Sequence, residues 1–221
     1  MRIGHQALRA AVALAIVAPL LSAPSGRVFA ASPLRANPVY RLMLRQTAGI
    51  RTSECDIEVQ TKLRSFPPAS FTFRGHSYFE APDKQAVVFD NVPGPLRGMF
   101  KDSPHIAPAP LWPARYEVTI AGDDGSSTTF HLVPKDPDSA IDHADVIVDD
   151  NTGLVSRFTF VNKNGSTVTT DNTYDRVGRY QVVVSQTGSA NGRGYRAEVT
   201  STFSNYQFNL VIPDSVFEEI Q

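Results

Sequence analysis

The sequence predicts a mainly β fold with a minor helical part: a single large antiparallel sheet of about eleven strands, which at this size is expected to curl, close or split. Three observations lead to this prediction. Apolar and polar residues alternate with a period of two through most of the chain after residue 51. Turn signals separate the alternating segments at short intervals, as expected for hairpins. Only one short segment shows a helical spacing of apolar residues.

The helical pattern lies within residues 34–50 and is centred on 37–50. Pro38 suits the first turn of a helix, because a missing N–H has no consequence there. Gly49 marks the end of the pattern. The apolar residues that recur at roughly helical spacing are Val39, Leu42, Met43 and Ile50.

The strands follow along the rest of the chain. The cleanest alternation covers residues 55–63, with apolar side chains on one face and charged or polar side chains on the other. Gly75 indicates a bend or close packing. Asn164-Gly165 predicts a hairpin turn, and so do the glycine-rich residues 188–194. The predicted strands are 55–63, 70–80, 85–90, 115–121, 127–133, 143–150, 153–162, 166–175, 179–186, 194–203 and 206–210.

Residues 91–115 interrupt the alternation with six prolines among large apolar side chains. Proline blocks strand pairing and extended helix. Burying one large apolar side chain contributes roughly 1.5–3 kcal/mol, so these side chains should cover something. A large sheet that does not close has an apolar face to hide. We therefore expect this tract to form a lid over the open side, together with the N-terminal helix. The expected lid residues are Leu96, Met99, Phe100 and Trp112.

Residues 1–30 have the features of a signal peptide. Basic residues precede an apolar run from Ala10 to Leu21, which is too short to span a bilayer. Small residues follow, and cleavage is expected after Ala30. The sequence thus predicts a periplasmic or secreted protein with one domain, residues 31–221. A short membrane helix that stays attached is the alternative.

Charge and motifs exclude several classes of protein. Loss of three arginines with residues 1–30 leaves 18 basic against 22 acidic residues, a net charge of −4. A mildly acidic chain without basic runs does not have the clustered positive charge that nucleic-acid binding requires. The sequence has no G-x-S-x-G, Walker, dinucleotide or H-E-x-x-H motif. Cys55 is the only cysteine and is expected to be a buried, inert thiol. We predict no enzyme, no cofactor and no metal.

Two chemical alternatives stay open at this point. The acidic residues between 136 and 150 offer oxygen ligands for calcium, but their spacing does not match an EF-hand and suits a solvated loop. The two carboxylates of a glycoside hydrolase lie close together in the fold and not in the sequence, so the sequence alone does not exclude such a pair. The histidines are scattered along the chain: His76, His105, His131 and His143. Two of them, His76 and His131, are expected to be strand residues that face solvent.

Four segments carry motifs that occur together in a known family. "FRGHSYFEAPDKQAVVFD" has a Gly-containing strand followed by a Pro-Asp-Lys turn, and "TTFHLVPKDP" has an L-x-P-K strand end. "HADVIVDDNTGLVSRFTFVNKNGSTVTTDNTY" has a pair of hairpins, and "FSNYQFNLVIPDSVF" closes the chain. In order and spacing they resemble the LolA-like family of periplasmic outer-membrane lipoprotein carriers and their relatives, over roughly residues 37–217.

The resemblance implies that the sheet curls into an open half-barrel, a half-closed antiparallel barrel that holds acyl chains or other hydrophobic ligands between sheet and lid. The implied partners are a lipid or acylated lipoprotein and a membrane-bound donor or acceptor protein, with the carrier a monomer. The alternative is a plugged core without ligand, in an envelope sensor or protein-interaction module. Strand parity gives the expected cavity residues: Ile57, Val59, Leu63, Phe71, Phe73, Val87, Phe89, Tyr116, Val118, Phe158, Phe160, Val182, Val184 and Phe203.

Overall fold

The computed structural model of the protein describes residues 33–46, 48–64, 68–90 and 106–218. Within these ranges ten strands form one antiparallel sheet that does not close, which confirms the predicted fold class. The sheet order is β3-β2-β1-β10-β9-β8-β7-β6-β5-β4, so β3 and β4 are its edges. The strands are β1 (Thr52–Leu63), β2 (Ala69–Glu80), β3 (Lys84–Phe89), β4 (Tyr116–Asp123), β5 (Ser127–Pro134), β6 (Ile141–Asp149), β7 (Val155–Asn162), β8 (Thr167–Val177), β9 (Tyr180–Gly192) and β10 (Tyr195–Phe208).

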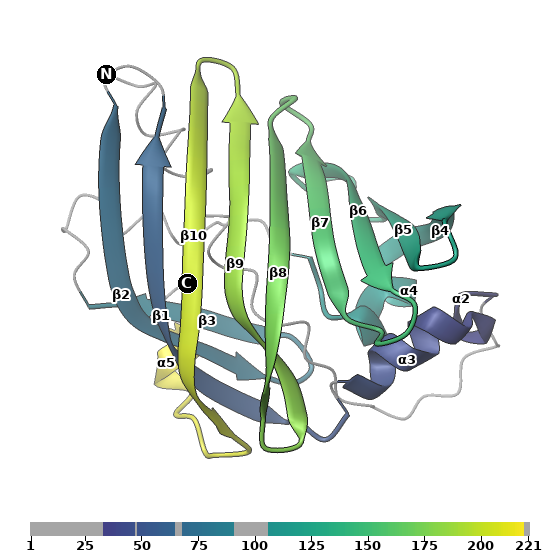
Figure 1. Cartoon of the computed structure of the whole chain (residues 1–221), viewed down its shortest axis with the longest axis horizontal. Coiled ribbons are helices and arrows are strands. Elements are labelled where there is room, and N and C mark those ends of the chain that lie inside the picture. The colour runs from purple at the N-terminus through teal and green to yellow at the C-terminus, as the bar shows by residue number, and fades with distance from the viewer. Residues whose placement is uncertain (1–32, 47, 65–67, 91–105, 219–221) are drawn as a thin grey trace.

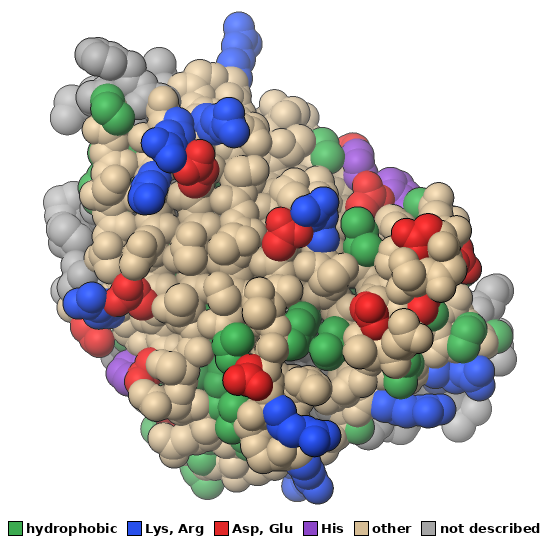
Figure 2. Space-filling model, viewed as in Figure 1, with side chains coloured by type: hydrophobic (Ala, Val, Ile, Leu, Met, Phe, Trp, Pro, Cys, Tyr) green, Lys and Arg blue, Asp and Glu red, His purple; other side chains and the backbone are tan. Residues whose placement is uncertain are grey.

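The sheet consists of two meanders, β1 to β3 and β4 to β10, which join where β1 pairs with β10. The connection from β3 to β4 therefore leads from one edge of the sheet to the other. Figure 1 shows the sheet curling so that β3 passes behind β10 in this view. We call the concave side of this curl the inner face and the convex side the outer face. Figure 2 shows the outer face, where several oppositely charged side chains lie side by side and hydrophobic side chains are few over the upper part of the sheet.

The predicted eleventh strand, residues 206–210, is the end of β10 and not a separate strand. Asn205 has a positive φ of 55°. The register between β10 and β1 shifts by one residue at this point, between Glu54 and Asp56. One extra residue bends a strand and leaves its pairing intact on both sides, which is a β-bulge. The correct count among the described residues is therefore ten.

The predicted turn at residues 188–194 is also shorter than expected. β9 continues to Gly192, and Ala190 is fully buried opposite Ala197 of β10. Only Arg193 and Gly194 separate the two strands. A glycine weakens a strand but does not remove its backbone hydrogen bonds, so pairing persists here.

The predicted helix is α3 (Pro38–Gln46), and one further turn, α2 (Pro33–Ala36), precedes it. Asn37 lies between them and caps α3, because its Oδ1 accepts a hydrogen bond of 2.9 Å from the backbone N–H of Tyr40. Pro38 occupies the first helical position, as predicted. The remaining helical turns are η3 (Ala109–Leu111), α4 (Trp112–Arg115) and α5 (Ser215–Glu218). No helix in the described ranges is long and apolar enough to cross a membrane.

Gly153, in the turn between β6 and β7, lets this turn contact the backbone of α3. Its φ is +70°, and a Cβ at this position would lie 2.7 Å from the backbone nitrogen of Met43. Only glycine combines this conformation with this approach. The Gln46 side chain adds a hydrogen bond to the carbonyl oxygen of Thr152. The helix is thus fixed at one end of β6 and β7 (Figure 1).

Buried apolar residues form two clusters. The main cluster takes residues from all ten strands, from α2 and α3, and from residues 106–112. The second cluster lies where β9 extends beyond its pairing with β10. Its buried members are Ile50, Phe79, Tyr180 and Val182. Most of the apolar face predicted from alternation therefore belongs to one continuous core.

Candidate functional site

The inner face brings most of the predicted cavity residues together in the main cluster. They come from six strands, and alternation along each strand places them on one side. The buried ones are Ile57, Val59, Leu63, Phe73, Val87, Tyr116, Phe158, Phe160 and Phe203. The partly buried ones are Phe71, Phe89 and Val118.

Val182 and Val184 are exceptions, and their predicted parity was wrong. The register between β8 and β9 shifts between Thr173 and Tyr174, so β9 holds one extra residue there. A bulge of this kind exchanges the faces of the residues beyond it. Val183 therefore joins the main cluster, whereas Val182 and Val184 belong to the second cluster.

The expected lid residue Trp112 is a core residue, with none of its surface exposed. Its indole Nε1 donates a hydrogen bond of 2.8 Å to the carbonyl oxygen of Ala107. Its ring lies 6.0 Å from that of Tyr40 and 5.8 Å from that of Phe130, measured between centroids. Trp112 thus fills the space between α3 and β5. The other expected lid residues lie outside the described residues: Leu96, Met99 and Phe100.

A hydrogen-bonded layer closes this end of the inner face. The Tyr40 hydroxyl donates to the carbonyl oxygen of Ala109 at 2.7 Å, and the backbone N–H of Ala107 donates to the Tyr116 hydroxyl at 3.0 Å. Burial raises the pKa of Tyr40 to about 12, against a smaller opposing effect of Arg35. Because the polar groups are paired within an apolar surrounding, this layer is a fixed part of the core.

The opposite end of the inner face carries three aromatic rings from β2 and β3, which we call the edge aromatics. Phe73 is buried, and its ring centroid lies 6.1 Å from that of Phe71 and 5.8 Å from that of Phe89. Phe71 and Phe89 are only partly buried. The inner face is therefore fully buried around Trp112 and only partly buried at Phe71 and Phe89.

Gly75 positions the edge aromatics, because it allows β3 to lie against β2. It pairs with Phe89 in the sheet. A Cβ at this position would overlap the carbonyl oxygen of Val88 and lie 2.7 Å from the Cα of Phe89. Of the two alternatives expected from the sequence at Gly75, a bend or close packing, the structure shows the close packing, and a side chain there would displace β3.

Reactive groups are few in the described part of the chain. No group of three or more His, Cys, Asp or Glu side chains there is arranged to hold a metal ion. His131 and His143 lie on the outer face, where each is hydrogen-bonded to an aspartate at 2.7 and 2.8 Å. Cys55 is buried as predicted, and burial raises its pKa to about 12. A protonated, buried thiol is a poor nucleophile at neutral pH.

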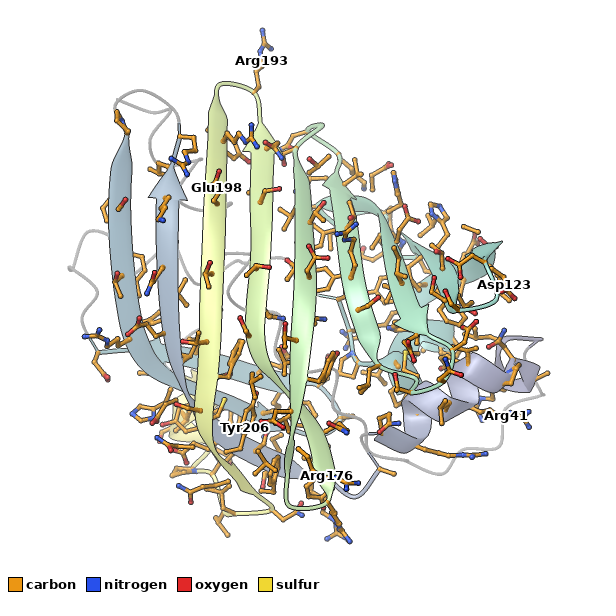
Figure 3. All side chains as sticks on the ribbon, viewed as in Figure 1. Arg41, Asp123, Arg176, Arg193, Glu198 and Tyr206 are labelled. Carbon is orange, nitrogen blue, oxygen red and sulfur yellow. The ribbon has the colours of Figure 1, made fainter. Side chains whose placement is uncertain are left out.

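A separate groove of about 540 Å³ lies beside α3, outside the inner face. Arg41 and Arg45 line it from the helix, and Asp123 and Asp150 line it from the strand ends. Figure 3 labels Arg41 on α3 and Asp123 at the end of β4. None of the predicted cavity residues contributes to it. Its charged walls distinguish it from the apolar site that the sequence predicts.

Three solved structures share this fold over most of the chain. A LolA superfamily protein from Nitrosomonas europaea matches with a TM-score of 0.61 and 9% identity, covering 85% of this chain and 98% of that one. A DUF1329 family protein from Desulfovibrio piger matches with a TM-score of 0.59 and 13% identity, covering 86% and 100%. A candidate outer membrane lipoprotein-sorting protein domain from Vibrio parahaemolyticus matches with a TM-score of 0.58 and 12% identity, covering 82% and 95%.

At the level of sequence, no family model matches the chain, and no curated protein matches it either. At identities of 9–13% the likeness is one of fold. It confirms the fold that the sequence motifs implied.

Proposed function

We propose that this protein, which has the fold of LolA superfamily proteins, is a non-enzymatic carrier that holds an acyl chain of a lipid or lipoprotein against the inner face of its sheet. The proposal includes a periplasmic or secreted location, a cleaved signal peptide at residues 1–30, and hand-off to or from a membrane-bound partner. The Vibrio parahaemolyticus relative supports it, because that protein is described as a candidate outer membrane lipoprotein-sorting protein domain.

The observation that carries the proposal is the difference in burial between the two ends of the inner face. Trp112 at one end is sealed, whereas Phe71 and Phe89 at the other are partly buried on an otherwise apolar surface. An acyl chain needs only such a surface, since each methylene that it buries contributes about 0.8 kcal/mol. The edge aromatics lie on β2 and the edge strand β3, where a ligand can reach the inner face from the side of the sheet.

A second candidate function rests on Trp112. This side chain fills the core and is hydrogen-bonded to Ala107, which supports a half-barrel that is filled by its own side chains and has no space for a ligand. A protein with such a core along its whole length would act through its surface, as an envelope sensor or an interaction module. This candidate predicts that no acyl ligand binds.

Extraction of the native protein separates the two candidates. The protein is purified from its own envelope fraction, extracted with organic solvent, and the extract is analysed by mass spectrometry. A carrier yields a lipid in stoichiometric amount. A clean extract, together with no binding of a fluorescent acyl-chain probe, would remove the carrier and favour the plugged module.

Substitution at the edge aromatics locates the binding surface. We expect Phe71→Ser and Phe89→Ser each to weaken binding of the acyl-chain probe by about tenfold or more, the scale of one large apolar contact. Val133→Ser is the matched control, because Val133 is an apolar residue exposed on the outer face. Equal binding by all three variants would place the ligand elsewhere. Circular dichroism checks that each variant keeps its sheet.

A further inference from the structure

The inner face is not uniformly apolar, because a row of polar side chains crosses its middle. The row comes from β1, β10, β9 and β8, which are neighbours at the centre of the sheet. At most 2% of the surface of each side chain is exposed. We call these residues the polar strip: Thr61, Ser201, Gln186 and Thr170.

Strand register places the members of the polar strip side by side. Ser201 of β10 pairs directly with Gln186 of β9. Val59 of β1 pairs with Ser201, and Thr61 is the next residue of β1 whose side chain lies on the inner face. Thr170 of β8 pairs with Gly188, which puts no side chain on either face. The strip therefore runs across the strands as one continuous feature.

Three hydroxyls of the strip have no hydrogen-bond partner among the residues that the structure describes. They are Thr61 Oγ1, Ser201 Oγ and Thr170 Oγ1. Buried hydroxyls in proteins are nearly always paired, since an unpaired one destabilises the fold. Another buried threonine, Thr128, follows this rule and donates to Asp150 at 2.7 Å. The strip thus presents donors to the inside of the half-barrel.

We propose that the acyl ligand places a neutral carbonyl group, that of an ester or amide, on the polar strip. The hydroxyls of Thr61, Ser201 and Thr170 donate to the carbonyl oxygens, and the hydrocarbon lies on the apolar surface on either side. This inference rests on the proposed function and narrows its ligand to lipids with acyl carbonyls. Free glycerides and acylated lipoproteins share this chemistry.

The surroundings of the strip select a neutral group. Val59 and Phe203 lie on one side of it along the strands, and Val199 and Ala197 lie on the other, all buried in the main cluster. Every buried polar residue in the described ranges is uncharged. A free carboxylate brought into this surface would lack a cation to offset the loss of its hydration. An ester or amide carbonyl needs only hydrogen-bond donors.

A competition experiment tests the carbonyl directly. Dodecane, dodecanoate, monododecanoylglycerol and a synthetic diacylated lipopeptide each displace a fluorescent acyl-chain probe from the full chain. We expect at least one of the two carbonyl ligands to bind about tenfold more tightly than dodecane or dodecanoate. Preference for the glyceride or for the lipopeptide identifies the source of the acyl group.

Substitution of the hydroxyls gives a second signature. We expect Thr61→Val and Ser201→Ala each to weaken binding of the preferred carbonyl ligand by about fivefold and to leave dodecane binding unchanged. Without ligand, both variants should resist urea at least as well as the wild type, because each loses an unpaired hydroxyl. Thr200→Val is the matched control, since Thr200 is the neighbour of Ser201 on the opposite face of β10.

The outcomes separate this inference from the proposed function. Equal affinity for dodecane and the carbonyl ligands, with no effect of Thr61→Val or Ser201→Ala, would assign the hydroxyls to bound water and overturn the inference alone. Failure of every ligand to displace the probe, or of the probe to bind, would overturn the carrier itself. Loss of carbonyl affinity in Thr200→Val as large as in Ser201→Ala would also overturn the inference.

Discussion

The hydroxyl of Tyr40 donates a hydrogen bond of 2.7 Å to the carbonyl oxygen of Ala109, a residue 69 positions away. Both residues are 1% exposed. The bond joins helix α3 to the segment that leads into β4, and the rings of Trp112 and Phe130 pack beside it. The N-terminal helix and the end of the connection between the two sheet edges are therefore held as one layer on the inner face.

Tyr40→Phe should destabilise the fold although it keeps the ring. It leaves the buried carbonyl oxygen of Ala109 without its donor, which costs about 1–3 kcal/mol. Urea denaturation measures the change in the free energy of unfolding. Tyr78→Phe is the control, because Tyr78 is half-buried on β2 and its hydroxyl makes no hydrogen bond among the described residues. An equally small change in both variants would show that the bond contributes nothing.

Stability at high pH should depend on the same hydroxyl. Burial raises the pKa of Tyr40 from 10.0 to about 12. The unfolded chain therefore loses this proton at lower pH than the folded chain, and ionisation favours unfolding from about pH 10 upward. The contribution of the buried tyrosine is complete below pH 10 and is lost as the pH rises to about 12.

Urea denaturation of the wild type and of Tyr40→Phe at pH 8 and pH 11 tests this dependence. The phenylalanine variant lacks the titrating group, so the stability gap between the two proteins should narrow at pH 11. Other buried tyrosines titrate equally in both proteins and cancel in the difference. A gap that stays constant would contradict a raised pKa at Tyr40.

Trp112 should report on the sealed end of the core, because it is the only tryptophan in the chain. Its side chain has no exposed surface, and its Nε1 is hydrogen-bonded to Ala107. We expect a blue-shifted emission that acrylamide quenches weakly in the native protein and strongly in urea. If the acyl ligand lies at the edge aromatics, saturation with it should leave this emission nearly unchanged. A large ligand-induced shift would place the ligand against Trp112.

The sequence predicted those features that depend on one strand or one turn. Alternation assigned Ile57 and Val59 to the inner face correctly. A strand with one buried and one solvent-exposed face has alternating apolar and polar residues, and this pattern is visible in the sequence. Gly75 indicated a bend or close packing for a similar local reason, since glycine fits where a Cβ has no room.

The features that the sequence did not predict depend on pairing between distant segments. Val182 and Val184 were placed on the wrong face, because their bulge is defined only by the register of β9 against β8. The hairpin signals in the sequence suggest one continuous meander, whereas the pairing of β1 with β10 divides the sheet into two meanders. The polar strip was missed for the same reason: Thr61 and Ser201 look like ordinary strand residues until register brings them together.

Gly75→Ala should disrupt the edge of the sheet that carries the edge aromatics. The added Cβ would meet backbone atoms of Val88 and Phe89, which cannot move aside as a flexible side chain could. We expect a loss of about 1–3 kcal/mol in the free energy of unfolding, the usual cost of overpacking. Hydrogen exchange should become faster in β3 than in β8, because β3 has only one neighbouring strand and can separate from β2 locally.

Gly122→Ala is the matched control for Gly75→Ala. Gly122 lies in β4, the opposite edge strand, and a Cβ there would be 3.8 Å from the nearest atom of Thr129, an ordinary contact. This variant should be as stable as the wild type or slightly more stable, since alanine restricts the unfolded chain more than glycine does. Acyl-chain binding should fall in Gly75→Ala and persist in Gly122→Ala, because only the first displaces Phe89. If both variants matched the wild type in stability and exchange, β3 would not be held against β2 at Gly75. If Gly75→Ala lost stability but bound the acyl chain normally, the ligand would not depend on Phe89.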